Sequence, residues 1–148
     1  MATISDKQLK CATQVINYSS ISQTDRFDKP SFDKVKFLSD LEMTSPKLIA
    51  LIKNIKKLDK QDFVKTGKLF KHYIYSSVGN GYGSKIIASA LIAAGYTLAI
   101  KKQGSKIVPD PQIIQTKNES KFMLLSSTAL WNTSVTPAMT KEILAVFN

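Results

Sequence analysis

Three glycines within five positions, followed by a serine and a lysine, bring residues 79–85 closest to phosphate-binding chemistry. Glycine lets a backbone approach a phosphate, and a lysine at a helix start adds positive charge there. A nucleotide loop of the form G-x-x-x-x-G-K-[ST] also needs a glycine before the lysine and a hydroxyl after it. Ser84 and Ile86 occupy those positions, and a G-x-G-x-x-G pattern fails at Ser84 too. A tight turn that starts a buried helix is favoured, with a nucleic-acid phosphate contact through Lys85 left open.

Other residues that could do chemistry are few. His72 is the only histidine and Cys11 the only cysteine. A Cys–His dyad is possible in principle, but a single residue of each type is usually incidental. The sequence contains no cluster of Cys and His residues for a zinc ion. The carboxylates are scattered, without a D-x-D or E-x-x-E arrangement for a metal. Trp131 and Tyr82 could stack on bases, although such residues more often pack in a core or at its rim. No catalytic residue and no metal site are predicted.

The charge balance points to a polyanionic partner. The chain carries 21 basic and 11 acidic residues, a formal charge of +10. Nucleic acid is the first expectation and an anionic membrane the second. Arg26 is the only arginine, and lysine suits phosphate backbones better than the bidentate recognition of guanine edges.

More than half of the excess charge falls between Lys47 and Lys71, where eight lysines accompany two acidic residues, a net of six positive charges. Ser45 and Pro46 predict the start of a helix here. One face of this helix is apolar and predicted to be core: Leu48, Leu51, Ile52, Ile55 and Leu58. Another face carries Lys53, Lys56, Lys57 and Lys60. Such a face is either simply solvated or turned towards phosphates.

The next elements predict a parallel sheet. Residues 73–78 have β-forming character, residues 86–94 are apolar almost all round, and Gly95 suits the end of that helix. Residues 96–100 return as a strand, completing a βαβ unit with an expected right-handed crossover. Residues 101–120 are interpreted as an excursion.

A third strand is predicted over Lys121–Ser126. It ends in a hydroxyl cluster, and ligands of open parallel sheets bind at the carboxyl ends of strands. Thr136 and Pro137 then begin a last helix through Ile143, Leu144 and Phe147.

Residues 1–45 form a polar lead segment, interpreted as irregular apart from a short amphipathic helix or extended strap around Phe32–Leu41. No apolar run is long enough for a transmembrane helix, and the N-terminus has no secretory signal, so no membrane is expected. The single cysteine predicts an intracellular, reducing compartment.

Several blocks resemble one family in order and wording: Thr44–Ile55, Lys71–Ser77, Leu124–Thr128 and Met139–Asn148. They are similar to the second RecA-like lobe of Snf2-like superfamily 2 helicases. Within that family, their wording most resembles the helicases and nucleoside triphosphatases of large nucleocytoplasmic DNA viruses. The resemblance covers roughly residues 44–148. It implies an α/β, partial RecA-like three-layer fold over residues 46–148 and, for a viral protein, the host cytoplasm or the virion.

The resemblance also implies contacts with nucleic-acid backbone. They would come from Ser76 and Ser77, from Gly81, Tyr82, Gly83 and Lys85, and from Ser126, Ser127 and Thr128. The family's phosphate loop, Mg²⁺ carboxylates and arginine finger have no counterpart in this chain. No cofactor is therefore expected on this chain alone, and ATP and Mg²⁺ only where a first helicase lobe completes the site.

The resulting hypothesis is a nucleic-acid-binding lobe or fragment, which works with a larger helicase or transcription complex. A rival hypothesis is a degenerate lobe kept as a structural or protein-interaction module, such as a virion component, which forms homo-oligomers through an unpaired sheet edge. A free-standing small ATPase is a third class, which a phosphate-release assay would test.

Overall fold

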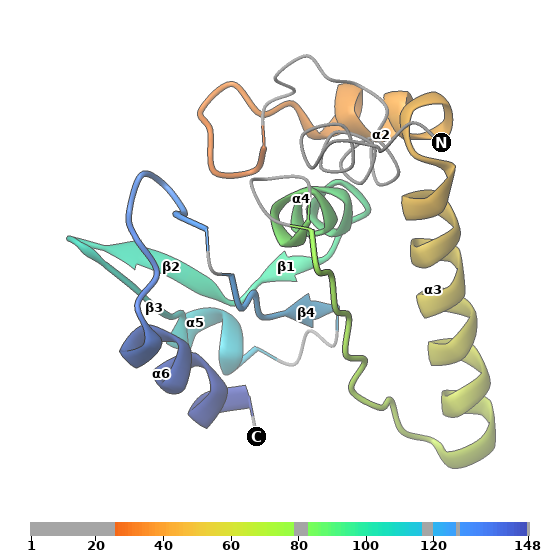
Figure 1. The fold of residues 1–148 in the computed structure, drawn as a ribbon. Helices are drawn as coiled ribbons and strands as arrows, with labels where there is room; N and C mark the ends of the chain where they lie inside the picture. Colours follow the sequence, from red (N-terminus) through yellow and green to blue (C-terminus); the bar gives the residue numbers. More distant parts are fainter. Residues whose placement is uncertain (1–25, 79–82, 117–119, 127, 148) are drawn as a thin grey trace, which may run out of the picture.

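The computed structural model describes residues 26–78, 83–116, 120–126 and 128–147, which form a mixed α/β fold with a short parallel sheet flanked by helices (Figure 1). The elements, in chain order, are α2 (Lys34–Thr44), α3 (Pro46–Thr66), α4 (Ser84–Ala93), β1 (Thr97–Leu98), β2 (Ile100–Gln103), β3 (Lys106–Pro109), α5 (Pro111–Ile114), β4 (Lys121–Phe122) and α6 (Pro137–Phe147).

The parallel pair is β1 with β4, in the register Thr97 opposite Lys121 and Leu98 opposite Phe122. The backbone N–H of Ala99 extends the pairing by donating to the carbonyl of Phe122 at 2.8 Å. α4 lies on one side of this pair and α6 on the other (Figure 1). The prediction of parallel strands near residues 96–100 and 121–126 is confirmed, although each ladder segment is only two residues long.

The predicted strand at residues 73–78 is wrong as a sheet member. Residues 68–78 return from the far end of α3 to the start of α4 without joining a ladder with any described strand (Figure 1). Their side chains nevertheless alternate, and Ile74 packs against the core. Their side chains alternate as in a strand, but no neighbouring described strand is hydrogen-bonded to them. Of the predicted βαβ unit, only the helix and the second strand are therefore present.

The excursion predicted at residues 101–120 is largely ordered. β2 and β3 form an antiparallel hairpin joined by Gly104 and Ser105, and α5 follows. Gly104 has a φ of +60°, which a two-residue hairpin loop requires and glycine adopts without strain. A glycine–serine pair between two short strands was a readable hairpin signal.

Two hydrophobic clusters form the core of the described residues, and α4 contributes to both. The first cluster joins α2, α3 and α4: Phe37, Leu41, Leu48, Ile52, Ile55, Ile86, Ala90 and Leu91. The second lies around the hairpin, the segment after β4 and α6: Ala88, Ile100, Ile107, Leu124, Leu130, Met139 and Ile143. Because α4 is buried on two sides, its sequence is apolar almost all round.

Helix ends follow the predicted signals. Ser45 caps α3 by accepting the Leu48 N–H at 3.4 Å. Gly95 has a φ of +96°, and its N–H and that of Tyr96 bond back to the carbonyls of Ile92 and Leu91, which ends α4 in a Schellman motif. α3 continues to Thr66, past the edge of the core. Leu58, predicted to be core, is therefore exposed.

The described part of the lead segment contributes side chains to the core. Asp33 caps α2 by accepting the N–H groups of Val35 and Lys36. The amphipathic-helix alternative is thus confirmed, since Phe37 and Leu41 of α2 are buried against α3 and α4. Further upstream, the Phe27 N–H donates to Ser89 Oγ on α4 at 3.0 Å. Residues 1–25 of the predicted lead segment lie outside the described residues.

Candidate functional site

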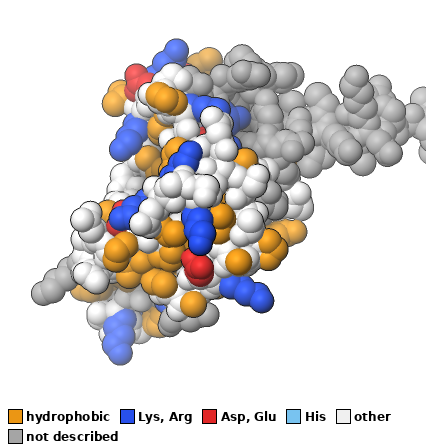
Figure 2. Space-filling model, turned by 90° about the vertical axis from the view of Figure 1, so that its left-hand side faces the viewer, with side chains coloured by type: hydrophobic (Ala, Val, Ile, Leu, Met, Phe, Trp, Pro, Cys, Tyr) orange, Lys and Arg blue, Asp and Glu red, His pale blue; other side chains and the backbone are white. Residues whose placement is uncertain are grey.

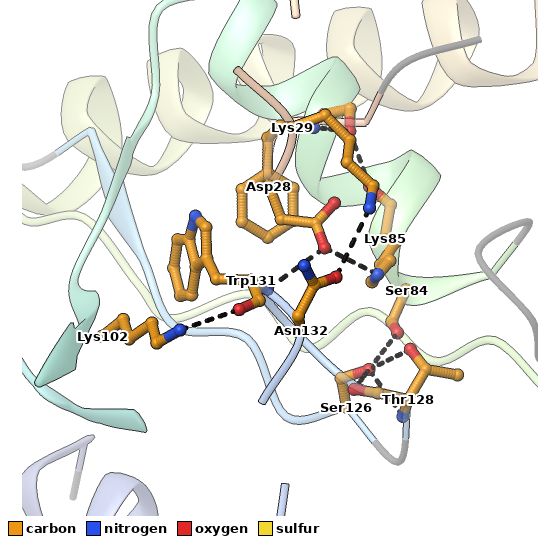
Figure 3. A network of polar contacts seen from close by, with 11 residues as sticks. Asp28, Lys29, Ser84, Lys85, Lys102, Ser126, Thr128, Trp131 and Asn132 are labelled. Atoms are coloured by element: carbon orange, nitrogen blue, oxygen red, sulfur yellow. Dashed lines mark hydrogen bonds and ion pairs between the residues drawn. The ribbon is translucent and has the colours of Figure 1, made fainter. Parts of the chain in front are cut away.

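Three hydroxyls meet where α4 begins and the chain leaves β4 (Figure 3). Ser84 Oγ donates to Ser126 Oγ at 3.1 Å, and Ser126 Oγ lies 2.8 Å from Thr128 Oγ1. The Thr128 N–H also donates to Ser126 Oγ at 3.1 Å. The structure therefore brings Ser126 and Thr128 to the N-terminus of α4, at the carboxyl edge of the parallel pair, where ligands of α/β folds usually bind.

Lys85, a predicted phosphate contact, forms an ion pair in the structure. Its Nζ lies 2.7 Å from Asp28 Oδ2, which also accepts the Trp131 N–H at 3.2 Å. The Asp28 side chain is 2% exposed and that of Lys85 15%. The positive charge of Lys85 is thus already matched by a buried carboxylate, and an approaching phosphate would meet a neutral pair.

Trp131 and Asn132 form a two-residue turn that several segments hold in place (Figure 3). Both have positive φ, +48° and +60°, and Leu130 and Thr133 on either side exchange backbone hydrogen bonds of 2.9 and 2.8 Å. Lys102 Nζ donates to the Trp131 carbonyl at 3.1 Å, while the Phe27 ring packs edge-on against the indole. This packing gives Trp131, considered as a base-stacking candidate, a structural role.

Gly83 is required by a close backbone approach. A Cβ at this position would lie 1.7 Å from the Val78 carbonyl oxygen and 3.2 Å from Ser76 Oγ. Ser76 is therefore beside the start of α4, whereas Ser77 is exposed. Gly81, Tyr82 and Ser127, also predicted to bind nucleic acid, lie outside the described residues.

The lysine face of α3 is a separate surface. Lys53, Lys56, Lys57 and Lys60 are all exposed. The ion pairs among the described residues are Lys85–Asp28, Lys101–Asp110 and His72–Asp59, so none includes a lysine of this face. Figure 2 views the side opposite α3, where Lys and Arg side chains are spread singly around a hydrophobic centre. The clustered basic residues of α3 contrast with that arrangement.

A third polar cluster joins α3 to the extended segment and to the end of α4. His72 Nε2 lies 2.7 Å from Asp59 Oδ1. Burial raises the pKa of Tyr96 above its ordinary value, and the nearby Asp59 carboxylate raises it further. Asp59 and Tyr96 border a shallow hollow that Lys56 and Ser120 also line. Cys11, the only cysteine with which His72 could form a dyad, lies outside the described residues.

Sequence reasoning missed Asp28, which accepts hydrogen bonds from Lys85 and from the Trp131 N–H in Figure 3. It lies in a segment interpreted as irregular, and no spacing pattern connects it to Lys85. The Trp131–Asn132 turn had a weak signal, because asparagine tolerates positive φ better than most residues. Within the described ranges, no group of three or more His, Cys, Asp or Glu side chains could hold a metal ion. None of the helices there has the length and apolarity to cross a membrane.

Comparisons with known proteins add no family assignment: no family model, no curated protein and no solved structure matches this chain.

Proposed function

We propose that this chain binds the phosphate backbone of nucleic acid, as a partial helicase-type lobe without a complete ATP site of its own. The lysine face of α3 is the main contact surface. The hydroxyl edge at Ser84, Ser126 and Thr128 is a second, neutral one. ATP and Mg²⁺ would belong to a partner lobe.

The observation that carries this proposal is the set of four exposed lysines at positions 53, 56, 57 and 60, without ion pairs among the described residues. The seven helical steps from residue 53 to residue 60 rise about 10 Å, so the four ammonium groups cover a strip that can meet two or three phosphates. Lysines without acidic partners keep their full charge for an external anion, and binding then releases counterions from the nucleic acid.

The test replaces all four lysines with glutamine. Binding of a 20-nucleotide strand and a 20-base-pair duplex is measured by fluorescence anisotropy across a salt titration. We expect the logarithmic salt slope to fall by about 2 and affinity at low salt to fall about 10- to 100-fold, since each lost phosphate contact removes about 0.9 from the slope.

A matched control removes the same charge elsewhere. Lys34, Lys36, Lys106 and Lys141 are also exposed, and their replacement with glutamine lowers the net charge equally. If this control weakens binding as much as the α3 variant does, affinity reflects total charge and the α3 surface has no special role. If the unaltered chain binds neither strand nor duplex at low salt, the proposed function fails.

A structural or protein-interaction module is the second candidate, favoured by one observation. Residues 69–78 make no backbone–backbone hydrogen bond with another described residue, which leaves an edge that a strand of another chain could join. Size-exclusion chromatography with light scattering discriminates between the candidates, because this module forms stable oligomers without nucleic acid.

A further inference from the structure

The extended segment between α3 and α4 presents one regular outward face. From residue 71 to residue 78 the side chains alternate between exposed and half-buried. His72, Ile74, Ser76 and Val78 are on the half-buried side, and Lys71, Tyr73, Tyr75 and Ser77 are on the exposed side. The inward contacts fix the direction in which the outward side chains project.

Two tyrosines dominate this outward face. Tyr73 is 81% exposed and Tyr75 76% exposed, and Phe70 just before them is 55% exposed. Aromatic side chains contribute strongly to burial energy, so a cluster of them left in solvent marks a surface that binds something.

The charged residues that flank these rings in sequence are all lysines. Residues 63–78 contain Lys65, Lys68 and Lys71 and no acidic residue. Lys65 and Lys68 are exposed, while Lys71 Nζ lies 4.7 Å from the Phe147 ring centroid and donates to the Phe147 carbonyl. Lys71 thus fastens one end of the segment to α6. The partner that suits exposed rings among lysines has both flat apolar groups and negative charges.

We propose that Tyr73 and Tyr75 are a stacking platform for unpaired bases, so that this chain prefers single-stranded nucleic acid; this rests on the proposed function and adds a second contact surface to it. Residues two apart on an extended chain are separated by about 6.6 Å, close to twice the 3.4 Å step of stacked bases. One base fits between the two rings, or each ring takes one base. A duplex cannot use the platform, because its bases are already stacked on one another.

A second copy of this chain is a poorer occupant of the same surface. Two copies that paired through residues 68–78 would bring Lys65, Lys68 and Lys71 of each together, and a symmetric interface offers no acidic partner from this stretch. Like charges that meet across paired strands are destabilising. A polyanion uses the same lysines favourably.

The test compares three ligands with the full chain: a 20-nucleotide oligothymidylate, an abasic strand of equal length, and a 20-base-pair duplex. Tyr73→Ala/Tyr75→Ala is expected to weaken oligothymidylate binding about 30-fold, because both aromatic rings that stack on bases are lost. Affinity for the abasic strand and the duplex, and the salt slope, stay unchanged. Tyr73→Phe/Tyr75→Phe retains the rings and binds oligothymidylate within about 3-fold of the unaltered chain.

The exposed hydrophobic side chains of α2 provide a control. Val35 and Met43 are 80% and 88% exposed, so Val35→Ala/Met43→Ala removes similarly exposed apolar groups without touching the platform. This variant is expected to bind all three ligands as the unaltered chain does. Photocrosslinking of a 5-bromouracil strand, followed by mass spectrometry, is expected to modify Tyr73 or Tyr75.

Three results would overturn the platform. One is equal affinity for the abasic strand and oligothymidylate. Another is unchanged oligothymidylate binding by the double alanine variant. The third is a dimer, seen by light scattering, that becomes a monomer on the alanine substitutions, since the tyrosines would then bind a second copy. If one of these results is found while the chain still binds the duplex, the stacking platform is refuted and the proposed function stands. If the chain binds none of the three ligands, both the platform and the proposed function are refuted.

Discussion

Asp28 and Lys85 connect three parts of the chain that are far apart in sequence. The Asp28 carboxylate accepts one hydrogen bond from Lys85 Nζ on α4 and another from the backbone N–H of Trp131. Its other oxygen, Oδ1, is buried and has no hydrogen-bond partner among the described residues. The pair explains why the lysine nearest to a phosphate-loop pattern serves the fold: its ammonium group compensates a carboxylate that water cannot reach.

Removing one member of this pair is expected to cost more than removing both. Lys85→Met leaves Asp28 buried and uncompensated, which lowers the free energy of unfolding by about 3–5 kcal/mol. In Asp28→Asn/Lys85→Met the amide oxygen still accepts the Trp131 N–H and no charge is buried, so much of the loss is recovered. Urea denaturation of the two single variants and the double variant measures this coupling. Additive effects would mean that the two side chains do not interact.

At the scale of elements, α3, α4 and α6 were predictable because their signals are local. Ser45 and Pro46 mark the start of α3, and Gly95 the end of α4, through hydrogen bonds within a few residues of the chain. A strand forms only where another strand supplies hydrogen bonds, and the local sequence does not show which segment that is. Residues 73–78 show the alternation of a strand without its ladder, whereas β2 and β3 pair through a turn that contains its own signal.

The packing of α2 on α3 and α4 can be tested directly. Leu41 is fully buried in the first cluster, so Leu41→Ala is expected to lower the free energy of unfolding by about 2–5 kcal/mol through lost contacts and a cavity. Met43→Ala on the exposed side of the same helix is expected to change it by less than about 0.5 kcal/mol. Thermal or urea denaturation provides the comparison. Equal small effects would show that α2 is not part of the cooperative core.

For the whole molecule, Tyr96 just after α4 makes one contribution to the pH dependence of stability at high pH. The pKa of Tyr96 is raised by burial and by Asp59, so folding favours the neutral phenol over the phenolate. This contribution is fully present below the unfolded tyrosine pKa, near 10, and is lost as pH rises through the higher folded value.

Tyr96→Phe is therefore expected to flatten the alkaline fall in stability. Above about pH 10 the free energy of unfolding should decrease less steeply in the variant than in the unaltered chain, since phenylalanine cannot ionise. All other ionisable groups are common to both proteins, so the difference between the two curves isolates Tyr96. Parallel curves between pH 8 and 11, measured by urea denaturation, would show that Tyr96 does not have a raised pKa.

The sequence by itself determined the helices α3, α4 and α6, the basic character of α3 and the hydroxyls after β4, because composition, caps and periodicity act within a few residues. Tertiary structure alone decided which charges remain for a partner. Lys85 is matched by a carboxylate 57 positions away, whereas the α3 lysines stay exposed without ion pairs among the described residues. It also decided that residues 71–77 turn two tyrosines to solvent. Burial and ion pairing depend on which distant segments meet, and no local pattern records that.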